Sequence, residues 1–176
     1  MGEEGTVGTL EALPPIVLRE VRWDDLALLV EHRNQWDTRR WLEDCNTITL
    51  EQQRRWFDTA SCRFRIATVD GEQIGLARLT TSHDDSAEVG CDVFLKYRGK
   101  GYGKAIFAAL MTRIVDLGAR RAELWVFLEN AAALRLYEHA GFHLDLSVPV
   151  KTFLRPDEPL STPRSRLYAK MVKRLA

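Results

Sequence analysis

Short apolar runs divide the first half of the chain into strands. Apolar and β-branched residues at 16–21, 64–69 and 73–80 predict three strands. The last two are joined around Asp70 and Gly71, a pair of residues that is typical of a tight hairpin turn. The first half of the chain is therefore expected to contain antiparallel strands.

Two helices are predicted between the first and second of these strands. The first follows Asp24, a plausible N-cap, and carries Leu26 and Leu29 on one face. The second begins with a capping box that runs from Thr49 to Gln52. A polar stretch that we assign to no element separates the two helices.

The second half of the chain alternates between strand and helix patterns. Apolar runs predict strands at 88–95 and 122–127, each followed by a helical pattern, and further strands at 143–150 and 166–172. The segment 151–164 contains three prolines and is expected to be a loop. This order predicts an α+β fold in three layers, with a mixed, mostly antiparallel sheet of seven strands and about four helices.

The composition is that of one globular domain. The chain has 176 residues, of which 45% are hydrophobic and 28% are charged. Its 25 basic and 25 acidic residues cancel, so no overall field favours nucleic acid or an anionic membrane as a partner. Residues 1–13 contain three glycines and three glutamates and are expected to form a flexible tail before a single domain at 14–176.

The cysteines and the hydropathy pattern exclude several classes of protein. Cys45, Cys62 and Cys91 are odd in number and lack the spacing of a metal site. We therefore expect no metal, and reduced thiols in the cytoplasm. The sequence contains neither an apolar run long enough for a membrane span nor a secretion signal. A monomer or a homodimer is expected.

Three alternating glycines stand where the strand at 88–95 gives way to a helix. The segment 98–104 reads RGKGYGK, with Gly99, Gly101 and Gly103 between larger residues. Glycine lets the backbone approach a ligand closely, and the N–H groups at a helix N-terminus favour an anion. The spacing matches neither a Walker loop nor a dinucleotide fingerprint. We expect this loop to bind a pyrophosphate.

A second motif follows the next predicted strand. Asn130 is placed to cap a helix, Tyr137 lies near the end of that helix, and Gly141 is placed to stop it. The pattern R-x-x-G-x-G at 98–103, followed by this Asn, a Leu-Tyr pair and a Gly-Phe pair, resembles the GNAT N-acetyltransferase superfamily. The resemblance covers about residues 16–175.

This resemblance implies an enzyme that transfers an acetyl group from acetyl-CoA to an amine. It also implies that the glycine loop holds the pyrophosphate, and that the preceding strand pairs with the pantetheine arm. A free strand N–H near Phe94 would then stabilise the oxyanion. The residues expected to contact the cofactor are Val93, Phe94, Leu95, Arg98, Gly99, Lys100, Gly101, Tyr102, Gly103, Lys104, Asn130 and Tyr137.

The resemblance also suggests the acid and the base. Tyr137 matches the family's tyrosine general acid, although it could instead pack on the sheet with its hydroxyl bonded elsewhere. Glu88, Asp92 and His83 are candidate bases. Glu88 and Asp92 share one face of the strand, and His83 lies in the loop before it. Glu88 is the first choice, since related enzymes often place a glutamate near the start of this strand.

The candidate acceptor-binding residues are Arg33, Asn34, Trp41 and His83. The first two helices look like those of the GNAT subgroup that acetylates nucleotide-linked amino sugars and, more loosely, the N-termini of ribosomal proteins. Arg33 could bind a diphosphate and Trp41 could stack on a base, or both could be ordinary residues at the edge of the core.

Three functions are therefore expected in order of preference. The first is acetylation of a small primary amine, with a nucleotide-linked amino sugar as the first guess, by direct attack in a ternary complex. The second is acetylation of a protein or peptide α-amine. The third is a non-catalytic module that senses acyl-CoA.

Overall fold

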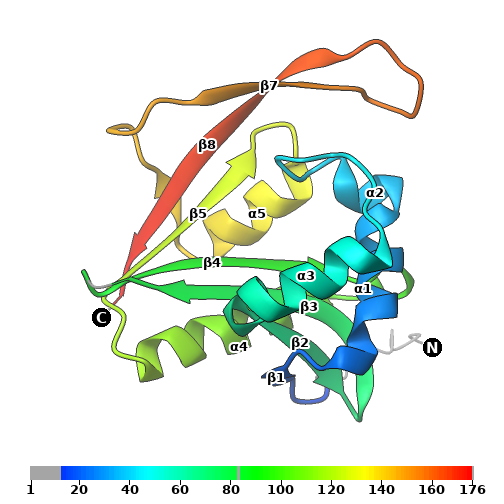
Figure 1. Ribbon diagram of the computed structural model, residues 1–176. Helices are drawn as coiled ribbons and strands as arrows, with labels where there is room; N and C mark the ends of the chain where they lie inside the picture. The colour runs from blue at the N-terminus through cyan, green and yellow to red at the C-terminus, as the bar shows by residue number, and fades with distance from the viewer. Residues whose placement is uncertain (1–12, 83, 176) are drawn as a thin grey trace, which may run out of the picture.

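The computed structural model describes residues 13–82 and 84–175 and shows a mixed sheet with helices on both faces (Figure 1). The strands are β1 (Val17–Glu20), β2 (Phe64–Val69), β3 (Glu72–Thr81), β4 (Ser86–Val93), β5 (Arg121–Phe127), β6 (His143–Leu144), β7 (Lys151–Arg155) and β8 (Arg164–Arg174). The helices are α1 (Leu26–Asn34), α2 (Trp36–Arg39), α3 (Leu50–Ala60), α4 (Tyr102–Asp116) and α5 (Ala131–His139). The predicted α+β class is confirmed.

The strand order places a parallel pair in the middle of an otherwise antiparallel sheet. The order is β1-β2-β3-β4-β5-β8-β6, and β7 pairs with β8 outside this path. Only β4 and β5 are parallel among the described strands, and α4 connects them. Parallel neighbours need such a crossover connection. The join between the two halves of the sheet therefore lies directly beside the glycine loop.

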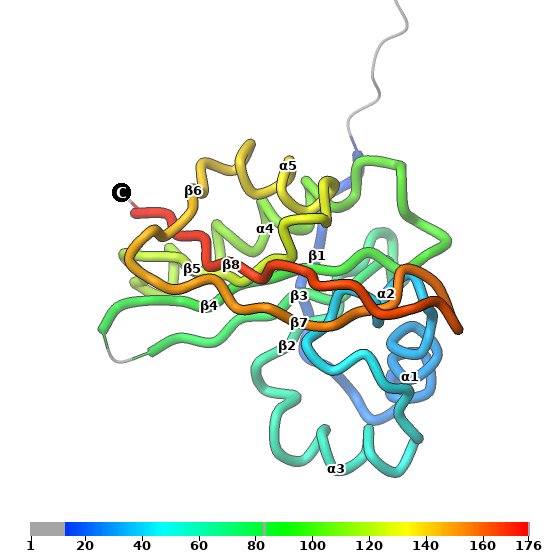
Figure 2. The backbone as a smooth tube through the Cα atoms, turned by 90° about the horizontal axis from the view of Figure 1, so that it is seen from above, coloured from blue at the N-terminus to red at the C-terminus, as the bar shows by residue number. Residues whose placement is uncertain are grey.

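Two helical layers enclose the sheet. Figure 2 shows α4 and α5 on one side of it and α1 and α3 on the other. The main core lies under α4, where the fully buried helix residues are Ile106, Phe107, Leu110 and Ile114. They pack on small and branched strand residues, including Ala77, Leu79, Val89, Ala122 and Leu124. A smaller cluster under α1 contains Leu26, Leu29, Ile66 and Phe94.

The N-terminus of α1 differs from our prediction. The helix begins at Leu26 after a 3-10 turn, and Asp25 rather than Asp24 supports the turn. The Asp25 carboxylate accepts hydrogen bonds from the Arg22 amide (2.7 Å) and from both terminal nitrogens of Arg19 (2.7 and 2.8 Å). Arg19 lies on β1. The contact of Asp25 with this strand therefore determines which aspartate supports the start of the helix, and the local sequence pattern does not show that contact.

The C-terminal strands also differ from our prediction. The sheet has eight strands rather than seven. The predicted strand at 143–150 contains only β6, because Asp145 then forms a turn: its carboxylate accepts from the Ser147 amide (3.1 Å), and its carbonyl accepts from the Val148 amide (3.2 Å). β7 occupies the start of the predicted loop at 151–164, where pairing with β8 along its length overrides the nearby prolines.

Several local signals are confirmed. Thr49 and Gln52 form the capping box of α3, with backbone-to-side-chain bonds of 3.2 and 2.7 Å. Gly141 follows the end of α5 with φ of +86°, as predicted, and Gly118 follows the end of α4 in the same way with φ of +83°. Residues 86 and 87, which precede the strand predicted at 88–95, belong to β4 as well.

Within residues 13–82 and 84–175, no helix combines the length and the apolar character that a bilayer crossing needs.

Candidate active site

The sheet opens into a cleft between β4 and β5. The two strands pair only from Ser86 with Arg121 to Glu88 with Glu123. Beyond that point no pair joins them among the described residues, although β4 continues to Val93 and β5 to Phe127. The opening forms part of a cleft of about 910 Å³ that extends from the glycine loop to α1 and α3. Its volume suits a large ligand together with a second, smaller one.

The open edge of β4 offers free peptide groups, but not the one that we expected. The Phe94 amide donates to the Ile74 carbonyl on β3 (2.9 Å), so it is not a free oxyanion donor. Because peptide groups alternate in direction along a strand, the amides of Cys91 and Val93 face the open side. The Val93 carbonyl already accepts from Arg98 Nε (2.9 Å). The amides of Cys91 and Val93 are therefore the available donors.

Phe94 and Leu95 lie outside the cleft. The Phe94 ring is 5% exposed and packs in the cluster under α1. Leu95 begins a 3-10 turn and is 46% exposed. A cofactor arm along the open edge would meet the backbone of residues 91–93 before it reached either side chain.

The glycine loop presents a series of free amides at the N-terminus of α4. Gly99 and Gly101 have φ of +76° and +85°, a region that side chains disfavour. Among the described residues, the amides of 99–103 donate to no backbone oxygen, whereas the Lys104 amide donates to the Gly101 carbonyl (3.1 Å). The loop is open to solvent, so these amides can exchange water for the oxygens of an anion. A pyrophosphate fits this arrangement, with the positive end of the helix dipole behind it.

The basic residues of the loop have different environments. Lys104 lines the cleft, whereas Lys100 lies with its ammonium 5.8 Å from the centre of the Tyr97 ring. Arg98 is held by the protein: Nη2 donates to Thr38 Oγ1 (2.8 Å), and Nη1 donates to the Asp37 carbonyl (3.3 Å). The Arg98 side chain is thus directed toward α2, and the loop's backbone is left to contact an anion.

Asn130 and Tyr137 bring α5 to the cleft. Asn130 Oδ1 accepts from the Ala133 amide (3.2 Å), which confirms the predicted cap. Tyr137 lines the cleft but is only 7% exposed, and its ring packs on Phe107 (centroids 5.2 Å apart). Its hydroxyl has no hydrogen-bond partner of ordinary geometry within the described chain. Burial, and then the nearby Cys91, raise the pKa of Tyr137, so its phenol stays protonated.

The two carboxylates of β4 differ in how many partners they have. Both oxygens of Asp92 are bound, Oδ2 to His32 Nε2 (2.7 Å) and Oδ1 to Arg98 Nη2 (3.2 Å). Within the described part of the chain, Glu88 has one ion-pair contact, from Oε1 to Arg78 Nη2 (2.9 Å). Both line the cleft. A base must have an oxygen free to accept a proton, so this geometry favours Glu88 over Asp92.

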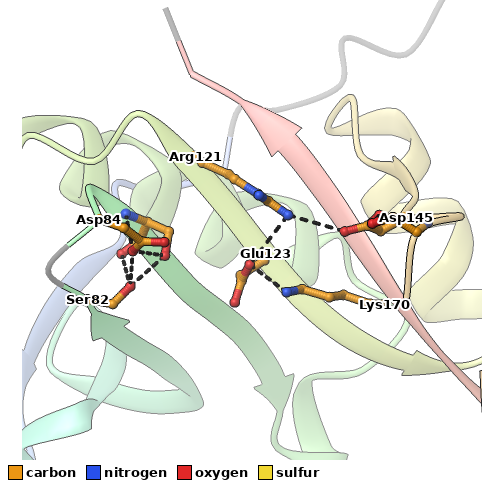
Figure 3. Close-up of polar contacts among 8 residues, drawn as sticks. Ser82, Asp84, Arg121, Glu123, Asp145 and Lys170 are labelled. Carbon is orange, nitrogen blue, oxygen red and sulfur yellow. Dashed lines mark hydrogen bonds and ion pairs between the residues drawn. The ribbon is translucent and has the colours of Figure 1, made fainter. Parts of the chain in front are cut away.

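The carboxylate that lies beside Glu88 in the strand register, at the closed end of the opening, is already paired. Glu123 Oε2 contacts Lys170 Nζ (2.8 Å) and, at 3.8 Å, Arg121 Nη2. Arg121 also reaches Asp145 (3.2 Å), so a chain of alternating charges crosses β5 and β8 (Figure 3). This network holds the closed end of the opening and leaves Glu88 as the nearby acid with a free oxygen.

His83 lies outside the described residues, but its neighbours are ordered by a serine-bound carboxylate. Asp84 Oδ1 accepts from the hydroxyls of Ser82 (2.6 Å) and Ser86 (2.7 Å), as Figure 3 shows. These bonds lower the pKa of Asp84 to about 2. The loop between β3 and β4 is therefore fixed on both sides of residue 83.

Two of the four candidate acceptor residues are occupied by the protein itself. Arg33 donates to the carbonyls of Asp44 (2.5 Å) and Asn46 (3.1 Å), and burial lowers its pKa. The Asn34 side chain bonds both the amide and the carbonyl of Ile48, each at 2.8 Å. Arg33 still borders the cleft, whereas Asn34 is not among the residues that line it. Both hold the loop that leads from α2 to α3.

Trp41 lines the cleft as expected, and it belongs to an aromatic wall that the sequence analysis missed. The other members are Trp125, Phe127 and Tyr168. Trp125 stacks on Tyr168 (centroids 5.3 Å apart), and Trp41 lies 6.4 Å from Phe127. Burial, and then the nearby Glu43, raise the pKa of Tyr168. Alternation along the strand at 122–127 could have identified Trp125 and Phe127, since they occupy the face opposite the core.

The comparisons with known proteins agree with this architecture. The model of the acetyltransferase (GNAT) domain matches residues 16–143. The mycothiol acetyltransferase of Corynebacterium efficiens is 32% identical over 101 residues, which cover 56% of this chain and 33% of that protein. The chain spans about a third of the length of the curated relatives that it matches.

Solved structures share the fold at low sequence identity. Spermidine N-acetyltransferase from Vibrio cholerae, in complex with CoA and spermine, has a TM-score of 0.74 and 18% identity, over 90% of this chain and 95% of that one. Ribosomal-protein-alanine N-acetyltransferase from Brucella melitensis has a TM-score of 0.71 and 19% identity, over 90% and 99%. With its family match over residues 16–143, this chain belongs to the GNAT acetyltransferase family.

Proposed function

We propose that this protein is an acetyl-CoA-dependent N-acetyltransferase that acts on a primary amine. The observation that carries the proposal is the open edge of β4, followed along the chain by a helix N-terminus whose amides at 99–103 donate to no backbone oxygen of the described residues. One feature suits a pantetheine arm and the other a pyrophosphate, and both border the same cleft. Family membership and the CoA in a solved structure of the same fold support this assignment.

The residues of the cleft supply each requirement of acyl transfer. The amides of Cys91 and Val93 are the donors for the developing oxyanion. Glu88 accepts the proton of the amine, directly or through a water molecule. Tyr137 donates its proton to the departing sulfur, and its raised pKa keeps that proton in place until the thiolate forms. The amine attacks the thioester directly while both substrates are bound.

The aromatic wall gives support to a nucleotide-linked amino sugar as acceptor. Trp41, Trp125 and Tyr168 border the cleft with aromatic rings. Cations already lie over two of them, Lys151 Nζ 4.0 Å from the Trp125 centre and Arg40 Cζ 4.7 Å from the Trp41 centre, so a base would stack only on ring surface that these leave open. Arg33 is a weaker diphosphate ligand than we expected, because its terminal nitrogens already bind loop carbonyls. Support for the subgroup that acetylates nucleotide-linked amino sugars therefore comes from the aromatic wall rather than from Arg33.

Acetylation of a peptide α-amine is the second candidate. The likeness to a ribosomal-protein-alanine N-acetyltransferase favours it, as does a cleft that runs open past α1 and α3. A non-catalytic acyl-CoA sensor is the third candidate. Within residues 13–82 and 84–175, one Glu88 oxygen has no ion-pair partner and the Tyr137 hydroxyl makes no hydrogen bond, and both observations argue against a sensor. A cytoplasmic location and a monomeric or homodimeric state remain predictions from the sequence.

A thiol-release assay on the purified protein tests the proposal. The panel contains nucleotide-linked amino sugars, aminoglycosides, polyamines, amino acids and N-terminal peptides, each with acetyl-CoA. Amine-dependent release of thiol, with the acetylated product identified by mass spectrometry, is the expected result. Tight binding of acetyl-CoA without turnover of any amine would favour the sensor instead.

A further inference from the structure

Asp92 lies at the centre of a chain of contacts that joins three elements. Its Oδ2 accepts from His32 Nε2 (2.7 Å) on α1, and its Oδ1 contacts Arg98 Nη2 (3.2 Å) at the start of the glycine loop. His32 is 5% exposed and its ring packs 4.7 Å from that of Phe94. An ionised carboxylate only accepts hydrogen bonds, so Nε2 carries the proton. Asp92 is thus shared by the acceptor side and the cofactor side.

Arg98 extends the same chain to α2 and to the open strand edge. Its Nη2 donates to Thr38 Oγ1 (2.8 Å), and its Nε donates to the Val93 carbonyl (2.9 Å). Thr38 is 4% exposed, borders the cleft, and precedes Trp41 of the aromatic wall by less than one helical turn. One guanidinium group therefore contacts α2, the strand edge and the shared carboxylate at once, and α2 leads directly to Trp41 of the aromatic wall.

We infer that Asp92, Arg98, His32 and Thr38 are positioning residues that couple cofactor binding to the arrangement of the acceptor wall. In this proposal, none of the four residues contacts the reacting atoms. Arg98 is the first residue of the glycine loop, and its side chain also holds α2 in place. When an anion binds to the glycine loop, the change in the loop shifts Arg98 or restricts its motion. The hydrogen bonds from Arg98 to Thr38 and Asp92 change as a result.

The coupling acts in both directions. If cofactor binding tightens the wall, an ordered wall must strengthen cofactor binding by the same factor. A charge-assisted bond such as that between Arg98 and Asp92 loses much of its strength when one partner becomes neutral. Neutralising Asp92, or removing the Thr38 hydroxyl, should therefore weaken CoA binding although neither residue lies in the glycine loop.

Hydrogen–deuterium exchange with CoA as the probe tests this inference, which depends on the proposed function for CoA binding. In the wild-type protein, saturating CoA is expected to slow exchange of the amides of α2 as well as those of the loop. Thr38→Val keeps the shape of the side chain and removes its acceptor oxygen. In this variant and in Asp92→Asn, we expect the protection of α2 to be lost and CoA to bind about 5-fold more weakly.

Thr59→Val is the matched control, because the Thr59 hydroxyl bonds only to carbonyls of its own helix among the described residues. It should leave both CoA affinity and the protection of α2 unchanged. The inference is overturned if Thr38→Val folds, binds CoA as tightly as the wild type and keeps the protection of α2. A wild-type protein that does not bind CoA would overturn the proposed function as well, so the two failures are distinguishable.

Discussion

Tyr137 is the single residue whose environment is most specific to the proposed chemistry. Its hydroxyl is buried at the cleft, and its raised pKa keeps it protonated, so it can donate a hydrogen bond to the charge that develops on the departing sulfur, whose own basicity the same burial would raise. Tyr137→Phe should lower kcat by about 10²-fold and leave acetyl-CoA binding unchanged. Steady-state kinetics with an amine that is turned over, beside calorimetry, check both parts. An unchanged kcat would remove Tyr137 from the mechanism.

Glu88 should be the more important of the carboxylates near the splayed strands. Glu88→Gln is expected to lower kcat by about 10²-fold, because the amide cannot take the proton of the amine. Glu123→Gln, which alters the paired carboxylate beside Glu88 in the strand register, should keep kcat close to that of the wild type. The assignment fails if the two variants lose activity equally while both remain folded by circular dichroism.

At the residue scale, the sequence predicted best where a signal is local. Asn130 and Thr49 cap their helices as expected, because a cap involves residues within one turn. Arg33 and Phe94 had roles that depend on distant partners. The Asp44 and Asn46 carbonyls that occupy Arg33, and the Ile74 carbonyl that occupies the Phe94 amide, cannot be read from neighbours in the chain.

The glycine loop is the element on which cofactor binding depends. Gly99 and Gly71 share a left-handed conformation (φ +76° and +84°), and apart from the adjacent residues an added methyl group would meet no described atom within 4 Å at either position. Gly99→Ala and Gly71→Ala should each cost about 1 kcal/mol of folding stability through backbone strain. Only Gly99→Ala should weaken CoA binding in a calorimetric titration. Equal loss of affinity in both would mean that global destabilisation is responsible.

The first strand and the first helix are joined by a buried ion pair. Asp25 is 3% exposed, and although burial alone would raise its pKa, the bonds from Arg19 and from the Arg22 amide lower it. Asp25→Asn should therefore lower the free energy of unfolding at pH 7 by about 3 kcal/mol.

The pH dependence of this pair has a definite sign. A lowered pKa means that Asp25 stabilises the fold above the unfolded value of about 3.9, and that this contribution is lost as pH falls through the folded value. In urea unfolding, the difference between the wild type and Asp25→Asn should be large at pH 7 and shrink below pH ~3.9. A constant difference across this range would show that the carboxylate's charge does not matter.

Helices and strands were predicted well where the hydrophobic periodicity agrees with the signals that start and stop an element. α4 and α5, with their glycine stops, follow patterns within one segment. β7 was missed because its five residues stand between prolines and form a strand only by pairing with β8, which follows the proline-containing loop at 156–163. α2 was missed because its four residues have no apolar face of their own, and contacts such as that of Trp36 Nε1 with the Asp157 carbonyl (3.3 Å) hold it.

The whole molecule shows why the acceptor is harder to predict than the cofactor. The cofactor side is built from two consecutive elements, β4 and α4, so one stretch of sequence contains it. The acceptor side draws on α1, α2, β3, β5 and β8, and the β7–β8 hairpin lies near α2 only in the folded chain (Figure 1). Its aromatic wall and the contact between Arg78 and Glu88 arise from this convergence.

The most direct test of the account is a comparison of CoA with pantetheine, which has the same thiol arm but no pyrophosphate. Calorimetry on the wild-type protein should show CoA binding at one site per chain, and pantetheine binding at least about 100-fold more weakly because the loop amides at 99–103 gain no acceptor. Equal affinities, or no binding of CoA, would contradict the assignment of the glycine loop and the proposed reaction that depends on it.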